Sequence, residues 1–257
     1  MSDVLVLCYH AVSPTWPADL SIAPDAFERQ LAQLQRRGYR GVTAAEAIEG
    51  EGRVVAVTFD DAYRSVLDVA KPILDRLGWP ASVYVPTDWA DRDEPMSWPG
   101  IDHWSPGPHE HELRCMTWAE LRGLADGGWE VGSHTRSHPR LPELDDATLD
   151  EELAGSRAAC EQHMGRPCTS LAYPYGAVDE RVVEAAGRAG YDHALTLPRA
   201  IHAPRPLYWP RVGIYPVDGR QDWRWRMKVS PFVRRARGSG AWTKLDGLRR
   251  RLRGIEP

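Results

Sequence analysis

The chain has 257 residues, of which 42% are hydrophobic and 26% are charged, and its formal net charge is −4. These values are typical of a soluble globular protein, and the length suits one large α/β domain or two small ones. The four cysteines lack CxxC spacing, which predicts free thiols and excludes a zinc finger or a disulfide framework. The apolar run 4–8 is too short for a signal sequence or a membrane span, so we expect a cytoplasmic protein.

Apolar runs alternate with amphipathic segments along most of the chain. In chain order, the expected strands are 4–9, 41–43, 54–59, 81–85, 129–132, 170–173, 191–197 and 209–215. The expected helices are 24–37, 44–49, 63–77, 118–125, 146–164 and 179–189. This alternation predicts an α/β fold with a parallel sheet and helices outside it. At this length, a closed or nearly closed barrel is the natural form.

The segment 87–116 differs from the rest, because it contains three tryptophans and three histidines and follows no period. A loop of this length in a compact domain is usually functional or disordered. Its tryptophans could form a wall of a sugar-binding groove, or they could simply cover the top of the barrel. We assign no role to His103, His109 or His111.

The most informative stretch is the apolar run 54–59, which is followed at once by Asp60 and Asp61. An apolar β-branched run of this length is typical of a buried strand. Two adjacent carboxylates there are costly to bury unless a positive group lies beside them, and a divalent metal would meet that need. The alternative interpretation is that Asp61 caps the following helix and that Asp60 is solvated.

Four of the expected strands end in polar residues. These are His10, then Asp60 with Asp61, then His134 with His138, and finally the turn 173–176. In a parallel barrel the carboxyl ends of the strands lie on one side and carry the active site. The order of the chain therefore predicts a common site for these residues.

His134 and His138 have the spacing of a zinc-binding helix, but Gly132 and Pro139 on either side favour a strand end and a turn. With Asp61 they would supply three protein ligands and leave positions open, which is the arrangement of a catalytic metal site. The alternative is that both histidines make ordinary hydrogen bonds in a loop.

Three motifs carry a family resemblance: 58–61 (TFDD), 134–138 (HTRSH) and 173–176 (YPYG). In this order they resemble the polysaccharide deacetylases, also known as the NodB homology domain or carbohydrate esterase family 4. The matching stretch runs from about 54 to 197. The resemblance implies a distorted (β/α)7 barrel and a divalent metal cofactor, with Zn²⁺ as the expected ion.

The resemblance also implies roles for the residues of these motifs. Asp61, His134 and His138 would bind the metal, and Asp60 would be the general base that activates the attacking water. The backbone N–H group of Tyr175 would stabilise the oxyanion that forms during the attack.

The chain departs from the family pattern in two places. Many members have an arginine at the start of the third motif, where this chain has Ala172; Arg211 is our candidate to replace it, and a surface arginine is the alternative. The usual late histidine that acts as general acid is also missing. Residues 7–10 (LCYH) instead resemble the circularly permuted branch that includes poly-N-acetylglucosamine deacetylases, which implies that His10 protonates the departing amine. A structural core histidine is the alternative.

The C-terminal part of the chain is strongly basic and interleaved with aromatic residues. We therefore divide the chain into a catalytic domain, 1–218, and a basic Trp/Arg-rich tail, 219–257. Such a tail suits peripheral association with an anionic membrane, here at the inner face, and a solvated terminus is the alternative. No nucleic-acid recognition fold and no obligate protein partner is expected.

The predicted function is metal-dependent hydrolysis of the N-acetyl group of an acetylated amino sugar, within a glycan or a lipid- or nucleotide-linked precursor. An O-acetyl esterase or a cyclic-amide hydrolase of the same superfamily is the nearest alternative. A carbohydrate-binding pseudoenzyme is the alternative from another class, and the missing arginine at position 172 keeps it open.

Overall fold

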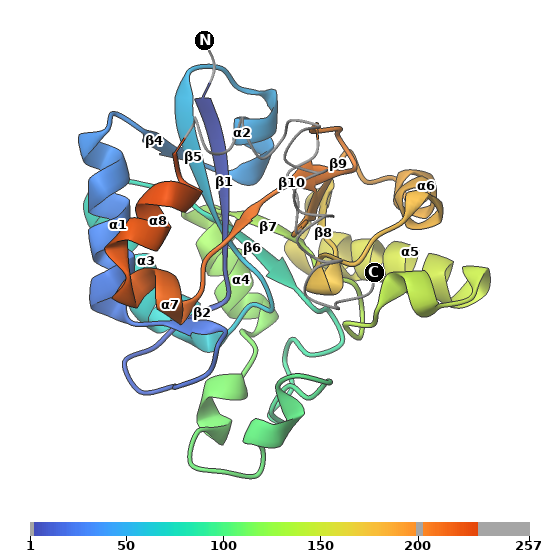
Figure 1. Cartoon of the computed structure of the whole chain (residues 1–257). Helices are drawn as coiled ribbons and strands as arrows, with labels where there is room; N and C mark the ends of the chain where they lie inside the picture. The colour runs from blue at the N-terminus through green and yellow to red at the C-terminus, as the bar shows by residue number, and fades with distance from the viewer. Residues whose placement is uncertain (1–2, 199–202, 231–257) are drawn as a thin grey trace, which may run out of the picture.

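A computed structural model of the chain describes residues 3–198 and 203–230. In this part of the chain the main sheet is built from parallel pairs and has the order β10-β9-β8-β7-β6-β5-β1-β11, with β4 beside β5 (Figure 1). Its strands are β1 (Asp3–Tyr9), β4 (Arg40–Val42), β5 (Arg53–Phe59), β6 (Ser82–Val85), β7 (Glu130–Ser133), β8 (Ser170–Ala172), β9 (His193–Thr196), β10 (Trp209–Pro210) and β11 (Val212–Gly213). Two further short strands, β2 (Ala11–Val12) and β3 (Ser21–Ile22), pair with each other.

The segment 209–213 nearly closes the sheet into a barrel. β10 pairs with β9 at one edge, whereas β11 pairs with β1 at the other edge. The prediction of one continuous strand over 209–215 is therefore wrong, because the chain crosses from one edge to the other at Arg211. The Arg211 N–H group still donates to Thr196 O, at 3.0 Å, and the Ile214 N–H group donates to Cys8 O, at 2.9 Å.

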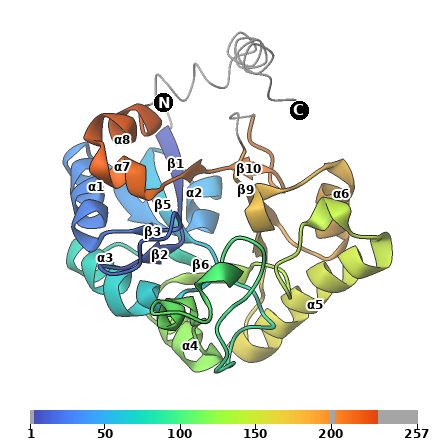
Figure 2. The ribbon, with the colours of Figure 1, turned by 60° about the horizontal axis from the view of Figure 1, so that its bottom comes forward.

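The helices other than α2 surround the sheet, as Figure 2 shows in a view onto the carboxyl ends of the strands, whereas α2 contributes to the cluster inside the barrel. They are α1 (Pro24–Arg36), α2 (Ala44–Glu49), α3 (Lys71–Leu77), α4 (Trp118–Asp126), α5 (Asp146–Met164), α6 (Glu180–Arg188), α7 (Pro216–Arg220) and α8 (Asp222–Lys228). The predicted helix 63–77 begins instead with a π-helical turn over Val66–Ala70. Pro72 follows this turn and has no N–H group to donate to the preceding turn, which gives a physical reason for the irregularity.

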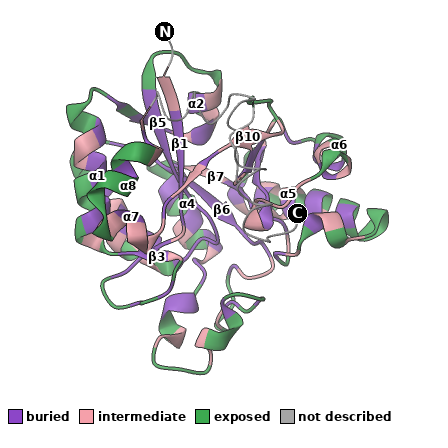
Figure 3. Cartoon of the chain, in the orientation of Figure 1, coloured by how far each residue is buried: buried purple, intermediate pink, exposed green. Residues whose placement is uncertain are grey.

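Side chains of β1 and β5 alternate between two buried clusters, as the period of two in a strand requires. Leu5, Leu7, Val55 and Val57 belong to the larger cluster, which also contains the buried residues of α1. The smaller cluster fills the barrel interior, because it draws side chains from six strands and from α2: Val6, Val42, Ala44, Ala47, Val54, Ala56, Tyr84, Ala172 and Leu195. β1 and β5 are therefore buried on both faces over most of their length, as Figure 3 shows, whereas β10 and β11 are half-buried.

Two of the described residues that follow position 218 are buried against the rest of the chain. Trp225 and Val229 are fully buried, and Gln33 of α1 donates to the Asp222 carboxylate at 2.9 Å. Most of the basic tail predicted from the sequence, residues 231–257, lies outside the described residues. The domain boundary at 218 thus stays a prediction. Among the described residues, no helix combines the length and the apolar character needed to cross a membrane.

Candidate active site

The residues predicted to form a site do come together at the carboxyl ends of the strands. They line one pocket of about 440 Å³: His10, Asp60, Asp61, His134, His138 and Tyr175. A larger hollow of about 530 Å³ lies beside α1 and α7, and none of these residues lines it. The candidate active site is therefore the smaller pocket, because it holds the titratable groups.

Asp61, His134 and His138 form a compact buried cluster in this pocket. One ligand atom from each residue lies within 4.8 Å of the other two. The Nε2 atoms of both histidines are 3.3 Å from the same carboxylate oxygen, Oδ1 of Asp61. Among the described residues, no hydrogen-bond donor satisfies this buried oxygen. A divalent cation between the three groups would satisfy it, so the residues present fit a metal site.

A hydrogen bond to the backbone orients His134. Its Nδ1 atom lies 2.7 Å from the carbonyl oxygen of Ala172, the last residue of β8. Because a carbonyl oxygen only accepts, Nδ1 carries the proton and Nε2 keeps its lone pair toward Asp61. Ala172, which stands where the family motif has an arginine, thus contributes to the site through its main-chain carbonyl group.

The turn that carries the two histidines is anchored to α5. The carboxylate of Glu152, which is 8% exposed, accepts hydrogen bonds from the Arg136 and Ser137 N–H groups, at 2.8 and 3.0 Å. The Ser137 hydroxyl group also donates to it, at 2.6 Å. Three hydrogen bonds to one buried carboxylate fix the loop between His134 and His138, so both imidazoles are held in place before any ligand binds.

The backbone at the site is strained. Asp61, His138 and Tyr175 have φ angles of 68°, 68° and 59°, which lie in the left-handed region. Residues other than glycine rarely adopt this conformation, and it costs on the order of 1–3 kcal/mol per residue. The packing of the barrel maintains these turns, and they aim the side chains of Asp61 and His138 at the same point.

Burial and the neighbouring charges set the protonation of the cluster. Burial lowers the pKa of His138 to about 3, so its imidazole is neutral at neutral pH. Burial alone would raise the pKa of Asp61, but the adjacent histidines outweigh it and lower the pKa, so this carboxyl group is ionised. For His134, the carboxylates of Asp60 and Asp61 outweigh burial and raise the pKa. A proton therefore competes with a cation for the Nε2 lone pair of His134.

Arg211 makes a bidentate ion pair with Asp60 inside the barrel. Its Nη1 and Nη2 atoms lie 2.6 and 2.7 Å from the two carboxylate oxygens, and Nη1 also donates to the Thr58 hydroxyl oxygen at 3.1 Å. The side chain is fully buried, so the alternative of a surface arginine is wrong. Burial would raise the pKa of Asp60, but the charge of Arg211 outweighs it and holds this pKa well below its usual range. Asp60 is thus ionised throughout the neutral pH range.

His10 and Tyr175 complete the rim. His10 follows β1, and its Nδ1 atom is buried and has no hydrogen-bond partner among the described residues. Burial lowers the pKa of His10. Tyr175 lies in the turn after β8, and Gly176 follows it. Residue 176 must be glycine, because φ is 65° there and a Cβ atom would lie 2.6 Å from Leu197 N. The main chain of this turn is therefore held close to β9.

The segment 87–116 forms part of the pocket wall. The Trp98 ring stacks on His138, with ring centroids 4.1 Å apart and an angle of 23° between the planes. The Tyr175 hydroxyl group donates to Pro99 O at 3.3 Å. Trp104, in contrast, packs edge-on against Trp16. Residues 98–101 thus line the pocket, whereas Trp104 packs away from it against Trp16. That residues 98–101 bind a sugar stays a prediction.

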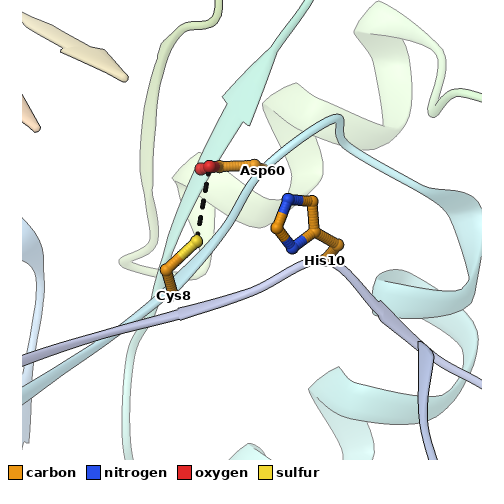
Figure 4. A group of neighbouring side chains, drawn as sticks. All are labelled: Cys8, His10 and Asp60. Atoms are coloured by element: carbon orange, nitrogen blue, oxygen red, sulfur yellow. Dashed lines mark hydrogen bonds between the residues drawn. The ribbon is translucent and has the colours of Figure 1, made fainter. Parts of the chain in front are cut away.

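Sequence reasoning missed one neighbour of Asp60. The Cys8 thiol lies 3.4 Å from Oδ2 of Asp60, and Figure 4 shows both Cys8 and His10 beside that carboxylate. All four cysteines are buried and free, as predicted. A signal was nevertheless present, because Cys8 precedes His10 by two residues at the end of β1, and positions two apart share a face in extended backbone.

Known proteins resemble the chain in both sequence and fold. The polysaccharide deacetylase family model matches residues 47–194. The Poly-beta-1,6-N-acetyl-D-glucosamine N-deacetylase of Staphylococcus aureus strain N315 is 22% identical over 209 residues, covering 75% of this chain and 67% of that protein. YxkH of Bacillus subtilis, provisionally named a polysaccharide deacetylase, is 26% identical over 198 residues, covering 74% of this chain but only 63% of its own length.

Solved structures show the same fold. The deacetylase PplD of Streptococcus pyogenes, solved with acetate, has a TM-score of 0.69 at 22% identity and covers 83% of this chain and 92% of its own. IcaB of Ammonifex degensii has a TM-score of 0.68 at 25% identity, covering 88% of this chain and 97% of its own. These likenesses confirm the predicted (β/α)7 barrel.

The fold and the position of the pocket define the class: a parallel (β/α) barrel with its candidate active site at the carboxyl ends of the strands. Within this class the family is shown by sequence, since the match covers more than half of the chain. The chain belongs to the polysaccharide deacetylase family.

Proposed function

We propose that the protein is a metal-dependent deacetylase that hydrolyses the N-acetyl group of an acetylated amino sugar. The observation that carries this proposal is the pairing of two sets in one pocket. The cluster of Asp61, His134 and His138 suits a divalent cation, and the Asp60–Arg211 ion pair beside it suits a base. The name of the Staphylococcus aureus relative supports an N-acetylated glucosamine polymer as the substrate class.

We assign the cation to Asp61, His134 and His138, with zinc as the proposed ion because two imidazole ligands and one carboxylate suit it. When bound, the ion supplies Lewis-acid chemistry: it polarises the acetyl carbonyl group and makes a water molecule more acidic. The neutral imidazole of His138 and the proton on Nδ1 of His134 leave both histidines ready to ligate through nitrogen lone pairs.

The other residues move protons and stabilise charge. Asp60, which Arg211 keeps ionised and oriented, accepts a proton from the attacking water. The Tyr175 N–H group donates a hydrogen bond to the oxyanion of the tetrahedral intermediate. His10 then protonates the departing amine. A His10 ring nitrogen lies within 4.8 Å of the Asp60 carboxylate. The proton that Asp60 takes from the water molecule can therefore pass to the neutral imidazole of His10 and on to the amine.

We also propose where the protein lies in the cell, mainly on sequence grounds. The cytoplasmic location, the catalytic domain over 1–218 and the association of the tail 219–257 with the inner face of an anionic membrane stay predictions. The exposed side chains of Trp223 and Met227 on α8 support the last of these, because apolar groups among basic residues are typical of membrane-surface helices.

The direct test measures acetate released from N-acetylglucosamine oligomers of different linkage and from O-acetylated analogues. The metal-free protein, prepared with a chelator, should release none, and added zinc should restore release. Faster release from the esters would favour the O-acetyl esterase alternative. No release from any substrate, with zinc bound in stoichiometric amount, would favour a carbohydrate-binding protein.

Replacing His10 by Ala should lower kcat for N-acetyl hydrolysis by about 100-fold or more. An aryl acetate has a leaving group that needs no protonation, so its hydrolysis should change far less. The measurement compares both substrates in the His10→Ala variant and in His111→Ala, which replaces an exposed histidine of the segment 87–116. Equal losses on both substrates would assign His10 a role other than the general acid.

A further inference from the structure

A second group of ligand-type side chains lies beside the first. Cys8, His10 and Asp60 each offer one atom, and these three atoms lie within 4.8 Å of one another. Figure 4 shows the Cys8 thiol and the His10 ring, both from the end of β1, on the same side of the Asp60 carboxylate. This group shares no residue with the cluster of Asp61, His134 and His138.

The separation of the atoms is that of ligands on one ion. Sulfur and oxygen ligands lie at about 2.3 and 2.0 Å from a tetrahedral zinc ion, so they are separated from each other by about 3.5 Å. The Cys8 Sγ and Asp60 Oδ2 atoms are 3.4 Å apart, where the thiol donates a hydrogen bond to the carboxylate, so loss of the thiol proton would leave both atoms at this spacing. Nδ1 of His10 is buried without a hydrogen-bond partner among the described residues, so a lone pair or a proton there lacks a protein contact. The grouping of the three ligand atoms, together with a buried and unpartnered nitrogen on the same imidazole ring, points to a bound cation.

We infer that Cys8, His10 and Asp60 form a second cation site, for a thiophilic divalent ion, and that an ion bound there inhibits the enzyme. Inhibition rests on the proposed function, because the ion would occupy both the proposed base and the proposed acid. Binding itself does not rest on it. In the binding step, the ion forms a bond to Cys8 Sγ, and the thiol proton passes to solvent.

Arg211 determines how strong this site is. Its guanidinium group already contacts both oxygens of Asp60, at 2.6 and 2.7 Å, and its positive charge disfavours a cation nearby. Each carboxylate oxygen has a second lone pair, so Oδ2 can accept from Arg211 and still ligate an ion. The second site should therefore fill after the Asp61 cluster, at higher metal concentration.

The donor atoms give the two sites different selectivity. The cluster of Asp61, His134 and His138 offers one oxygen and two nitrogens, whereas the second site adds a thiolate. Soft ions such as Cd²⁺ prefer thiolate, and hard ions such as Mg²⁺ do not. Excess Cd²⁺ or Zn²⁺ should thus inhibit, whereas excess Mg²⁺ should not.

The experiment adds Cd²⁺ to protein already loaded with one equivalent of zinc, and follows the near-ultraviolet absorption of the cadmium–thiolate bond together with acetate release. The wild type should bind a further equivalent, gain the absorption band and lose acetate release. The Cys8→Ser variant should gain no band and keep the activity that it had at one equivalent of zinc. Cys168→Ser, which replaces another buried thiol, should behave as the wild type.

The absorption band separates this inference from the proposed function. A protein without deacetylase activity can still gain the band at Cys8, so only the inhibition would then be lost. No band in the wild type, or the same band in Cys8→Ser, would overturn the inference. If Cys8→Ser does not fold, Cys8→Ala serves in the same comparison, with the far-ultraviolet circular dichroism spectrum as the check of folding.

Discussion

Replacing Asp60 by Asn should lower kcat for N-acetyl hydrolysis by about 10²- to 10⁴-fold, the range for losing a general base. An amide side chain has almost the size of a carboxylate but cannot accept the proton of the attacking water. KM should change little, because the pocket keeps its shape. With one equivalent of added zinc, the amount of bound zinc should also be unchanged, since the proposed ligands of the first ion are Asp61, His134 and His138.

The matched control for this prediction is Asp93→Asn, which makes the same chemical change at an exposed position. The measurement is kcat and KM for both variants, with bound zinc determined on the same samples. Because Asn cannot neutralise the buried Arg211, the melting temperature is also recorded, and rates are compared well below it. A loss of less than tenfold in the folded, zinc-loaded Asp60→Asn variant would remove Asp60 from the role of base.

Much of the fold could be predicted because its signals are local. The helix 146–164 was predicted at the residues that the structure gives, since Asp145 caps its first turn and Gly165, with φ of 65°, ends it. The buried strands β1 and β5 follow from uninterrupted apolar runs. Each of these features depends on side chains that are near one another in the sequence.

The contacts that close the barrel could not be predicted in the same way. Arg211 and Asp60 are 151 positions apart, and the sequence offered Arg211 only as a candidate. Their contact requires the chain to cross between β9 and β1 at that residue. No local period signals such a crossing, because β10 and β11 have two residues each.

The strained turns of the site also lack a sequence signal. A left-handed backbone conformation is normally predicted where the sequence has glycine. Asp61, His138 and Tyr175 adopt this conformation although none of them is glycine. Such positions are expected where function outweighs local preference. The motifs identified these residues, but the conformation that brings Asp61 and His138 together depends on the packed barrel.

Replacing Arg211 by Met should destabilise the protein by about 3–5 kcal/mol at neutral pH, the usual cost of leaving one partner of a buried ion pair unpaired. Met keeps most of the volume of the side chain but removes the charge that both oxygens of Asp60 contact. Arg205→Met is the matched control, because Arg205 pairs with Glu180 through both of its Nη atoms at an exposed position. Exposed pairs contribute at most about 1 kcal/mol, so urea unfolding should separate the two variants clearly.

The pH dependence of the Arg211→Met variant follows from the pKa of Asp60. In the wild type this pKa is depressed, so the ion pair stabilises the protein above the unfolded pKa of about 3.9, and this contribution is lost as pH falls through the folded pKa. Without Arg211, burial raises the pKa of Asp60, so the variant carries an unpaired carboxylate at neutral pH and a neutral acid at lower pH. The stability difference from the wild type should therefore shrink as pH falls, while the acidic limb of kcat/KM moves to higher pH. A variant with an unshifted acidic limb would show that Arg211 maintains the fold without setting the charge of Asp60.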